Sequence, residues 1–337
     1  MAWQTLFGST KTAGKWVDHI RRRVDFARID ADAKRDVQLV IAGPSREELT
    51  AALREAGEPA GDALRLHPSL PDPARLTKNA RAAIYALAAN DPDSWRGDSA
   101  AFPRHVYAVR PPGAMALETS PATPKKPTPG SPALYSVSAL TGSELRRHLL
   151  PDVVSAYSGL EIPLAAQVPA FRPVVAARLT LNCAQNSLKI AAASALADHI
   201  PMIGLITGGI ASAGDTIAIT ALQMRMLLQI AAAYGKKAEF ARIIELLPVL
   251  GGGYGWRALA REASGFIPIA GIVIKAGIAY AGTVVVGQAA SYYYETGSQM
   301  PSSAISALYR EASERARTLA IQFAKRAGKK PGDEKPS

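Results

Sequence analysis

The chain has 337 residues, of which 48% are hydrophobic and only 7% aromatic, and it carries a formal net charge of +11. This length allows two domains, and an apolar fraction made mostly of Ala, Leu, Ile and Val favours packed helices over a β-sandwich. The single cysteine, Cys183, excludes an intrachain disulfide and a cysteine-based metal site, so we interpret it as a core residue.

The positive charge indicates an anionic partner, either nucleic acid or an acidic membrane surface. It is spread over pairs and triplets of basic residues at 21–23, 146–147, 236–237, 325–326 and 329–330. Cations scattered beside apolar helices fit a membrane surface better than a nucleic-acid stripe. We therefore expect membrane lipid, and not nucleic acid, as the partner. The alternative, that these cations only solubilise an apolar protein, stays open.

Residues 1–30 predict an N-terminal amphipathic helix. Trp3 and Trp16 are on its apolar side, and Lys11 and Lys15 are among its charges. Aromatic residues opposite cations are typical of a helix that lies in the membrane interface, so both tryptophans are candidate interface residues. Packing onto the protein itself is the alternative. The segment has no continuous apolar core, so it is not a signal peptide, and we expect the protein to begin in the cytoplasm.

Residues 31–142 predict a small α/β domain. An apolar strand at 37–42, a Gly43-Pro44-Ser45 turn and a helix at 46–56 form the opening unit of a doubly wound fold. Residues 114–132, rich in Pro, Thr and Lys, predict a surface loop or disordered insert. Three further apolar runs predict the remaining strands of a parallel sheet, at 82–89, 105–109 and 135–139.

Residues 143–327 predict a mainly α-helical domain, which makes the fold class α/β plus all-α. Residues 328–337 predict a disordered tail. Proline, glycine and capping signals divide the helical region. The longer helices are predicted at 174–196, 215–234, 237–247, 269–294 and 301–327.

Two segments of the helical region, 199–224 and 266–294, are each long enough to cross a bilayer as a helix. Each segment contains a single Asp, Glu, Lys or Arg residue: Asp215 in the first and Lys275 in the second. Such charges are costly in an apolar setting unless they are paired or wetted. The two could pair across neighbouring helices, or each could lie at a helix end. For Asp215 we favour an N-cap of the helix that follows it.

Small residues recur every four positions in the second segment, at Ala279, Thr283, Gly287 and Ser291. This stripe allows a neighbouring helix to approach closely, in a membrane or in a tight soluble bundle. Three tyrosines end the segment, Tyr292, Tyr293 and Tyr294. They predict an aromatic belt at a membrane interface. The alternative is that some of them lie in the protein core and others at its rim.

Four short motifs occur in order: Thr-Ala-Leu-Gln-Met-Arg-Met at 220–226, Ala-Tyr-Gly at 233–235, Ile-Pro-Ile-Ala-Gly at 267–271, and Tyr-Tyr-Glu-Thr-Gly at 293–297. Residues 169–297 thereby resemble the helical domain of unknown function in YcjF-like bacterial inner-membrane proteins. The same domain follows the G domain in some Era-like or dynamin-like GTPases. The resemblance implies a protein at the cytoplasmic face of the bacterial inner membrane, or integral to it, with a possible GTPase partner.

The N-terminal half resembles a G domain in the order of its elements but lacks the nucleotide motifs. The first strand is followed by Gly43-Pro44-Ser45-Arg46-Glu47, without the Gly-Lys-Ser/Thr that holds phosphate and Mg²⁺. The third apolar run ends in Arg110 instead of Asn-Lys-x-Asp. Only residues 138–142, Ser-Ala-Leu-Thr-Gly, resemble the last guanine-contacting loop. A degenerate G-like domain and an unrelated α/β domain both stay open.

From these patterns we expect no catalytic residue, cofactor or metal site. The leading hypothesis is a non-enzymatic membrane-associated protein whose helical domain enters or presses on the bilayer, with the α/β domain as a docking platform. One alternative is a GTPase-related membrane-remodelling protein that works with nucleotide or with a GTPase partner. The other is a soluble helical scaffold.

Overall fold

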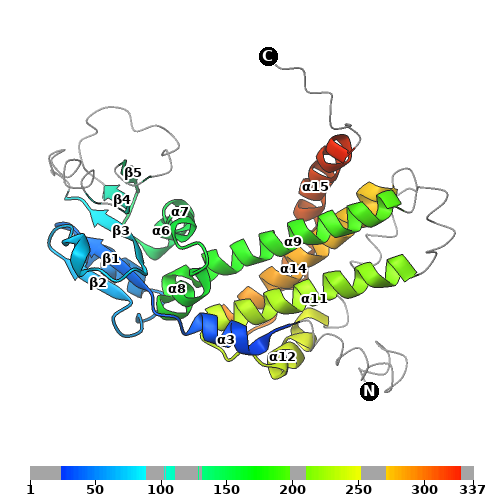
Figure 1. Cartoon of the computed structure of the whole chain (residues 1–337), viewed down its shortest axis with the longest axis horizontal. Coiled ribbons are helices and arrows are strands. Elements are labelled where there is room, and N and C mark those ends of the chain that lie inside the picture. Colours follow the sequence, from blue (N-terminus) through cyan, green and yellow to red (C-terminus); the bar gives the residue numbers. More distant parts are fainter. Residues whose placement is uncertain are drawn as a thin grey trace, which may run out of the picture. The chain divides into compact units, whose positions relative to one another are not determined.

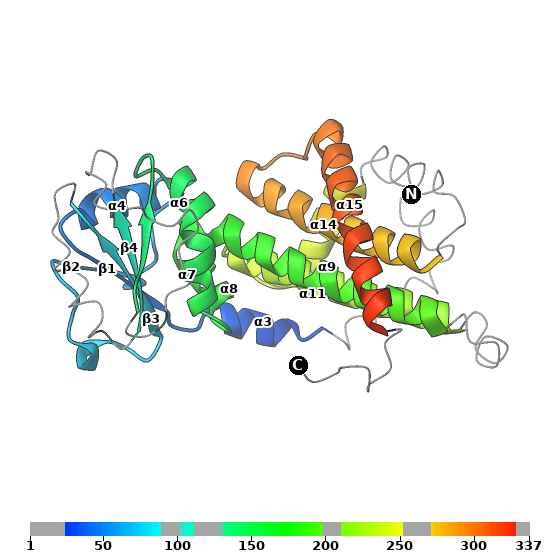
Figure 2. The ribbon, with the colours of Figure 1, turned by 90° about the horizontal axis from the view of Figure 1, so that it is seen from above.

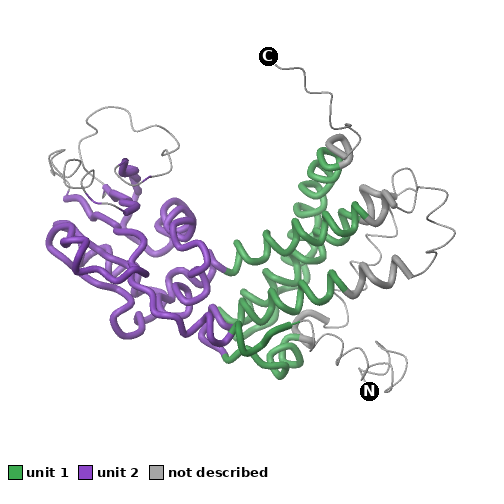
Figure 3. Tube along the Cα trace, viewed as in Figure 1, with its two compact units in different colours: residues 1–29, 176–231, 237–337 green, residues 30–175, 232–236 purple. Residues whose placement is uncertain are grey.

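The computed structural model describes residues 24–88, 102, 104–110, 128, 131–197, 210–251 and 271–327 (Figures 1 and 2). Within these ranges, the side chains of 194–197, 210–217, 247–251, 271–275 and 324–327 lie outside the description. The chain forms two compact units (Figure 3). Unit 2 comprises Asp30–Val175 and Ala232–Lys236, and unit 1 comprises Met1–Ile29, Ala176–Ala231 and Lys237–Ser337.

Unit 2 is built on a five-stranded sheet of order β2-β1-β3-β4-β5, in which every pair is parallel. All residues of β1 are buried, as expected for a strand covered on both faces. The order, with the first strand between the second and the third, is that of flavodoxin-like sheets. The predicted parallel sheet is therefore confirmed. Its strands are β1 Gln38–Ala42, β2 Leu64–His67, β3 Ala80–Ala86, β4 His105–Arg110 and β5 Ala133–Ser136.

The connections between strands cover the two faces of the sheet differently. The connection from β1 to β2 crosses the sheet in one direction, and the connections from β2 through to β5 cross it in the other. Because crossovers between parallel strands are right-handed, the first connection lies on one face of the sheet and the later connections lie on the other. Accordingly, α4 (Arg46–Arg54) covers one face. On the other, Leu70, Leu76 and Phe102 of the later connections pack against buried residues of β1, β3 and β4.

Further helices flank this sheet in the chain. Helix α3 (Phe26–Ala33) precedes it, and α6 (Gly142–His148), α7 (Leu150–Ala156) and α8 (Glu161–Gln167) follow it, with the 3₁₀ turn η2 at Pro169–Phe171. Unit 2 thus reaches Val175, beyond residue 142, the boundary predicted from the sequence.

Unit 1 is helical, as predicted. The C-terminal end of α9 and the N-terminal ends of α11 and α14 lie at the same end of this unit (Figures 1 and 2). We call it the distal end. None of the helices that the structure describes combines the length and the apolar content needed to cross a membrane. The long elements are α9 Arg172–Ala197, α11 Ile210–Ala233, α12 Phe240–Gly251, α14 Gly271–Thr296 and α15 Ser302–Ala327.

The start of α11 corrects one expectation. The helix begins at Ile210, five residues before Asp215, so the N-cap interpretation of Asp215 is wrong. Gly214 suggested a break, but a glycine inside a helix costs only about 1 kcal/mol relative to alanine. Ala211 and Ala213, which have the highest helix propensity, continue the helix through it.

The core of unit 1 is unusually rich in alanine, and its helices approach closely. Alanines of α9, α14 and α15 make up most of one buried cluster, with Tyr280 and Tyr309 as its large members. At Gly287 of α14, an added Cβ would overlap the hydroxyl of Thr180 in α9 and would lie 2.8 Å from its Cβ. Thr180 itself is 1% exposed. The predicted small-residue stripe is thus packed against a neighbouring helix at Gly287.

We expect Gly287→Ala to destabilise the protein by about 1–3 kcal/mol, because the added methyl group overpacks a filled contact. Gly282 in the same helix is the matched control, since a Cβ there meets nothing within 4 Å. Gly282→Ala should raise the free energy of unfolding by up to about 1 kcal/mol through helix propensity. Urea unfolding of both variants measures the difference. Equal effects would contradict the close approach of α9 and α14.

Candidate functional site

The carboxyl end of the sheet, beside β1 and β3, is where doubly wound folds of this strand order bind ligands. The loop after β1 is turned inward at this edge. Gly43 has φ of 101°, and an added Cβ would overlap the carbonyl oxygen of Ala86 at the end of β3. Ser45 donates its N–H to that same oxygen at 3.2 Å, and Arg46 donates its N–H to Gly43 O at 3.4 Å. Pro44 has no N–H, so three successive positions of the loop, 44–46, offer no free backbone donor to a phosphate.

The charged groups at this edge do not favour an anion either. Arg46 donates through Nη1 to Gly43 O at 3.3 Å and pairs through Nη2 with Glu47 at 3.4 Å. Glu47 and Glu48 lie in the first turn of α4, where they repel an anion. His67, at the end of β2, has its pKa lowered by burial and by Arg65, so it is neutral at pH 7.

The loop that resembles a guanine-contacting loop caps α6 instead. Thr141 Oγ1 accepts the N–H of Glu144 at 3.4 Å, and the Glu144 carboxylate accepts the hydroxyl of Ser138 at 2.8 Å. That second bond is the main reason why the pKa of Glu144 is lowered. Gly142 donates its N–H to Glu55 Oε2 at 2.8 Å, and a Cβ on Gly142 would lie as close to that oxygen. These polar groups are therefore used within unit 2.

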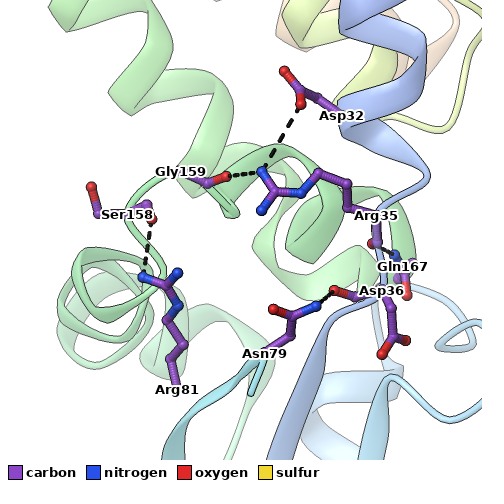
Figure 4. Close-up of polar contacts among 8 residues, drawn as sticks. All are labelled: Asp32, Arg35, Asp36, Asn79, Arg81, Ser158, Gly159 and Gln167. Carbon is purple, nitrogen blue, oxygen red and sulfur yellow. Dashed lines mark hydrogen bonds and ion pairs between the residues drawn. The ribbon is translucent and has the colours of Figure 1, made fainter. Parts of the chain in front are cut away.

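At the amino end of the sheet, four side chains donate to backbone carbonyls and tie the α7–α8 loop to the segments entering β1 and β3 (Figure 4). All four side chains donate to backbone carbonyls of the protein itself, and this edge of the sheet is opposite the edge where such folds usually bind ligands. We therefore interpret these four hydrogen bonds as structural. The bonds run from Arg35 to Gly159 O (3.0 Å), Arg81 to Ser158 O (3.3 Å), Asn79 to Asp36 O (2.8 Å) and Gln167 to Arg35 O (2.8 Å).

In unit 1, Thr283 is the centre of a polar contact among three helices. Gln223 of α11 donates to Thr283 Oγ1 at 2.9 Å, and Thr283 donates to the carbonyl of Ala279 at 2.7 Å. Ser187 Oγ of α9 lies 3.3 Å away, and both hydroxyls are fully buried. Such a contact fixes how the helices align. The sequence showed Thr283 only as a small residue, because nothing local marks Gln223 or Ser187 as its partner.

Cys183 lies one helical turn before Ser187 in α9 and is 7% exposed. Burial raises the pKa of its thiol to about 11, so the thiolate needed for nucleophilic chemistry is scarce at neutral pH. Its interpretation as a core residue is confirmed.

The tyrosines at the end of α14 contact α12. Tyr293 donates its hydroxyl to Glu245 at 3.1 Å, and its ring lies 5.6 Å from that of Tyr294. Glu245 also pairs with Arg242. For Tyr293 and Tyr294 these contacts favour positions at the rim of the core. Tyr292 is partly exposed and stays a candidate for the membrane interface.

Four other candidates fall outside what the structure describes in full. Trp3 and Trp16 lie outside the described residues, and the side chains of Asp215 and Lys275 do as well. Among the described residues, no group of three or more His, Cys, Asp or Glu side chains is placed to hold a metal ion.

Comparison of the chain with protein-family models, with curated proteins and with solved structures found no match. The resemblance to the YcjF-like domain and the degenerate G-domain interpretation therefore stay hypotheses.

We expect neither GTP nor ATP to bind in the micromolar range. The loop after β1 lacks the lysine that holds a triphosphate, the N–H groups of Ser45 and Arg46 are bonded within the protein, and α4 begins with two glutamates. Isothermal titration calorimetry with Mg²⁺ present checks this. Micromolar binding that is lost in Ser45→Ala or Arg46→Ala would contradict it.

We expect Asp215 and Lys275 to contribute independently to stability. Asp215 lies about 8 Å along the axis from the first residue of α11, and Lys275 lies about 6 Å from the first residue of α14, so both are near helix ends at the distal end. A double-mutant cycle with Asp215→Ala and Lys275→Ala should be additive within about 0.5 kcal/mol. A double variant much milder than either single one would show a buried pair, because loss of one partner costs about 3–5 kcal/mol.

Proposed function

We propose that this chain is a non-enzymatic, membrane-associated bacterial protein, in which unit 1 contacts the inner membrane and unit 2 is a docking platform on the cytoplasmic side. The observation that carries the proposal is the distal end of unit 1. Three helix ends lie there (Figures 1 and 2). In the sequence, the mainly apolar residues 199–209 lead from α9 to α11, and the apolar residues 266–270 precede α14. Apolar sequence next to helix ends supports entry into a bilayer.

The helices that lead to this end support the same function. Helix α14 has no charged residue between Lys275 and Glu295. In α11, every residue from Ala218 to Met224 is partly exposed, whereas Met226–Leu228 and Ile230–Ala233 are buried. Leu222 and Met224 thus present apolar surface that the described part of unit 1 covers only in part. Exposed apolar surface of this kind is a mark of protein or membrane contact.

Unit 2 supports the docking role through its open edge. Strand β2 has β1 as its one described neighbour, so its outer backbone groups face away from the sheet. Leu66 in this strand is 40% exposed. An edge of this kind can accept a strand from a protein partner, and a GTPase is the partner class that the family resemblance implies.

The second candidate, a soluble helical scaffold, rests on the contact between Thr180 and Gly287. Close packing of small residues occurs in soluble bundles as well as in membranes. A nucleotide-dependent remodelling enzyme is not favoured, because both loops that resemble nucleotide loops use their polar groups internally.

We expect the full chain to float with phospholipid vesicles. Leu222→Asp should weaken vesicle binding at least about tenfold, because it replaces a partly exposed leucine, whose burial is worth about 1.5–3 kcal/mol, with a charge. Leu66→Asp in unit 2 is the matched control and should bind like the parent chain. A parent chain that is monodisperse and vesicle-free without detergent would favour the scaffold.

A further inference from the structure

The formal charge of the protein is segregated between its two units. Unit 2 contains 17 Lys and Arg residues against 16 Asp and Glu, which leaves +1. The residues of unit 1 contain 22 against 12, which leaves +10 of the total +11. If the positive charge served only solubility, we would expect it on both units. The excess of cations in unit 1 therefore requires another explanation.

Both units keep exposed cations outside ion pairs. Unit 2 engages six of its cations with carboxylates within 4.0 Å, and five of its exposed cations form no ion pair with any described residue. In unit 1, six exposed cations form no ion pair with any described residue, and they come from α3, α9, α11 and α15. Cations without a carboxylate partner keep their field for an external anion. These six are Arg28, Lys189, Arg225, Arg310, Arg315 and Arg317.

Two of these cations flank the apolar segments. Lys189 is the last charged residue of α9, and none follows it within residues 190–197 of that helix. Arg225 is the one cation of α11. A cation beside an apolar segment is placed where lipid headgroups lie when the segment enters a bilayer, and it gains about 1 kcal/mol from an anionic surface.

From this segregation we infer that unit 1 selects acidic phospholipid, and that Lys189 and Arg225 contact the anionic headgroups. The inference rests on the proposed membrane function and adds the chemistry of the partner. The attraction is electrostatic, so it falls as salt shortens the Debye length from about 10 Å at 0.1 M to about 3 Å at 1 M. Unit 2, which is nearly balanced in charge, contributes little to it.

The test is flotation of the full chain with vesicles of phosphatidylcholine alone or of phosphatidylcholine with phosphatidylglycerol, at low and high salt. We expect binding to increase with phosphatidylglycerol and to decrease with salt. The variant Lys189→Gln with Arg225→Gln should bind acidic vesicles about fivefold more weakly per cation removed, the equivalent of about 1 kcal/mol each. Both residues are exposed, so their loss should leave folding intact, which circular dichroism checks.

The matched control is Arg75→Gln with Lys78→Gln, which removes the same charge from exposed positions in unit 2. It should bind acidic vesicles within twofold of the parent chain. Equal weakening by both variants would overturn the assignment to unit 1. Equal binding to neutral and acidic vesicles would overturn the electrostatic inference and leave the membrane function standing. No binding to either would overturn both. Displacement from acidic vesicles by an equimolar DNA duplex would show that nucleic acid is the preferred anion.

Discussion

The close approach of α9 and α14, where Thr180 fills the space that Gly287 leaves open, is the contact on which unit 1 depends. Small side chains bury little apolar area each, so helices rich in alanine gain stability mainly by packing their backbones near one another. The alanine-rich cluster around Tyr280 has this character. The bonds of Thr283 to Gln223 and Ala279 then fix the alignment of α11 and α14, because a buried hydroxyl without a partner would be costly.

In unit 2, the described part of the edge where doubly wound sheets bind ligands uses several of its polar groups internally. The strand order is that of a doubly wound sheet, but in the loop after β1 the N–H groups of Ser45 and Arg46 bond to carbonyls of the protein itself. Glu55 holds the start of α6 through the N–H of Gly142, 87 residues along the chain. These bonds stabilise the unit and occupy three backbone donors, the N–H groups of Ser45, Arg46 and Gly142. The doubly wound strand order of unit 2 therefore does not by itself define what unit 2 binds.

The sequence predicted the elements whose signals are local. Four of the five strands lie within a few residues of apolar runs, and α9, α14 and α15 lie within about two residues of their predicted bounds. Strand β2 was missed because its four residues, Leu-Arg-Leu-His, alternate too briefly to stand out, and as an edge strand it is partly exposed. Proline at 248 was expected to end α12, which continues to Gly251, since one lost hydrogen bond near a helix end is tolerated.

The candidate sites were less predictable than the fold, because their contacts are long-range. The partners of Thr283 lie on two other helices, and the partner of Gly142 lies on an element before the second strand. The charge segregation could be counted only after the two units were known. The proposed function assigns membrane contact to unit 1 and a protein partner to unit 2, and the charge segregation supports that assignment.

Hydrogen–deuterium exchange of the full chain, with and without acidic vesicles, tests this division most directly. The account predicts that vesicles slow exchange in peptides covering residues 190–224 and 266–294 and leave the five strands of unit 2 unchanged. Slower exchange confined to unit 2, in a chain that binds the vesicles, would contradict it.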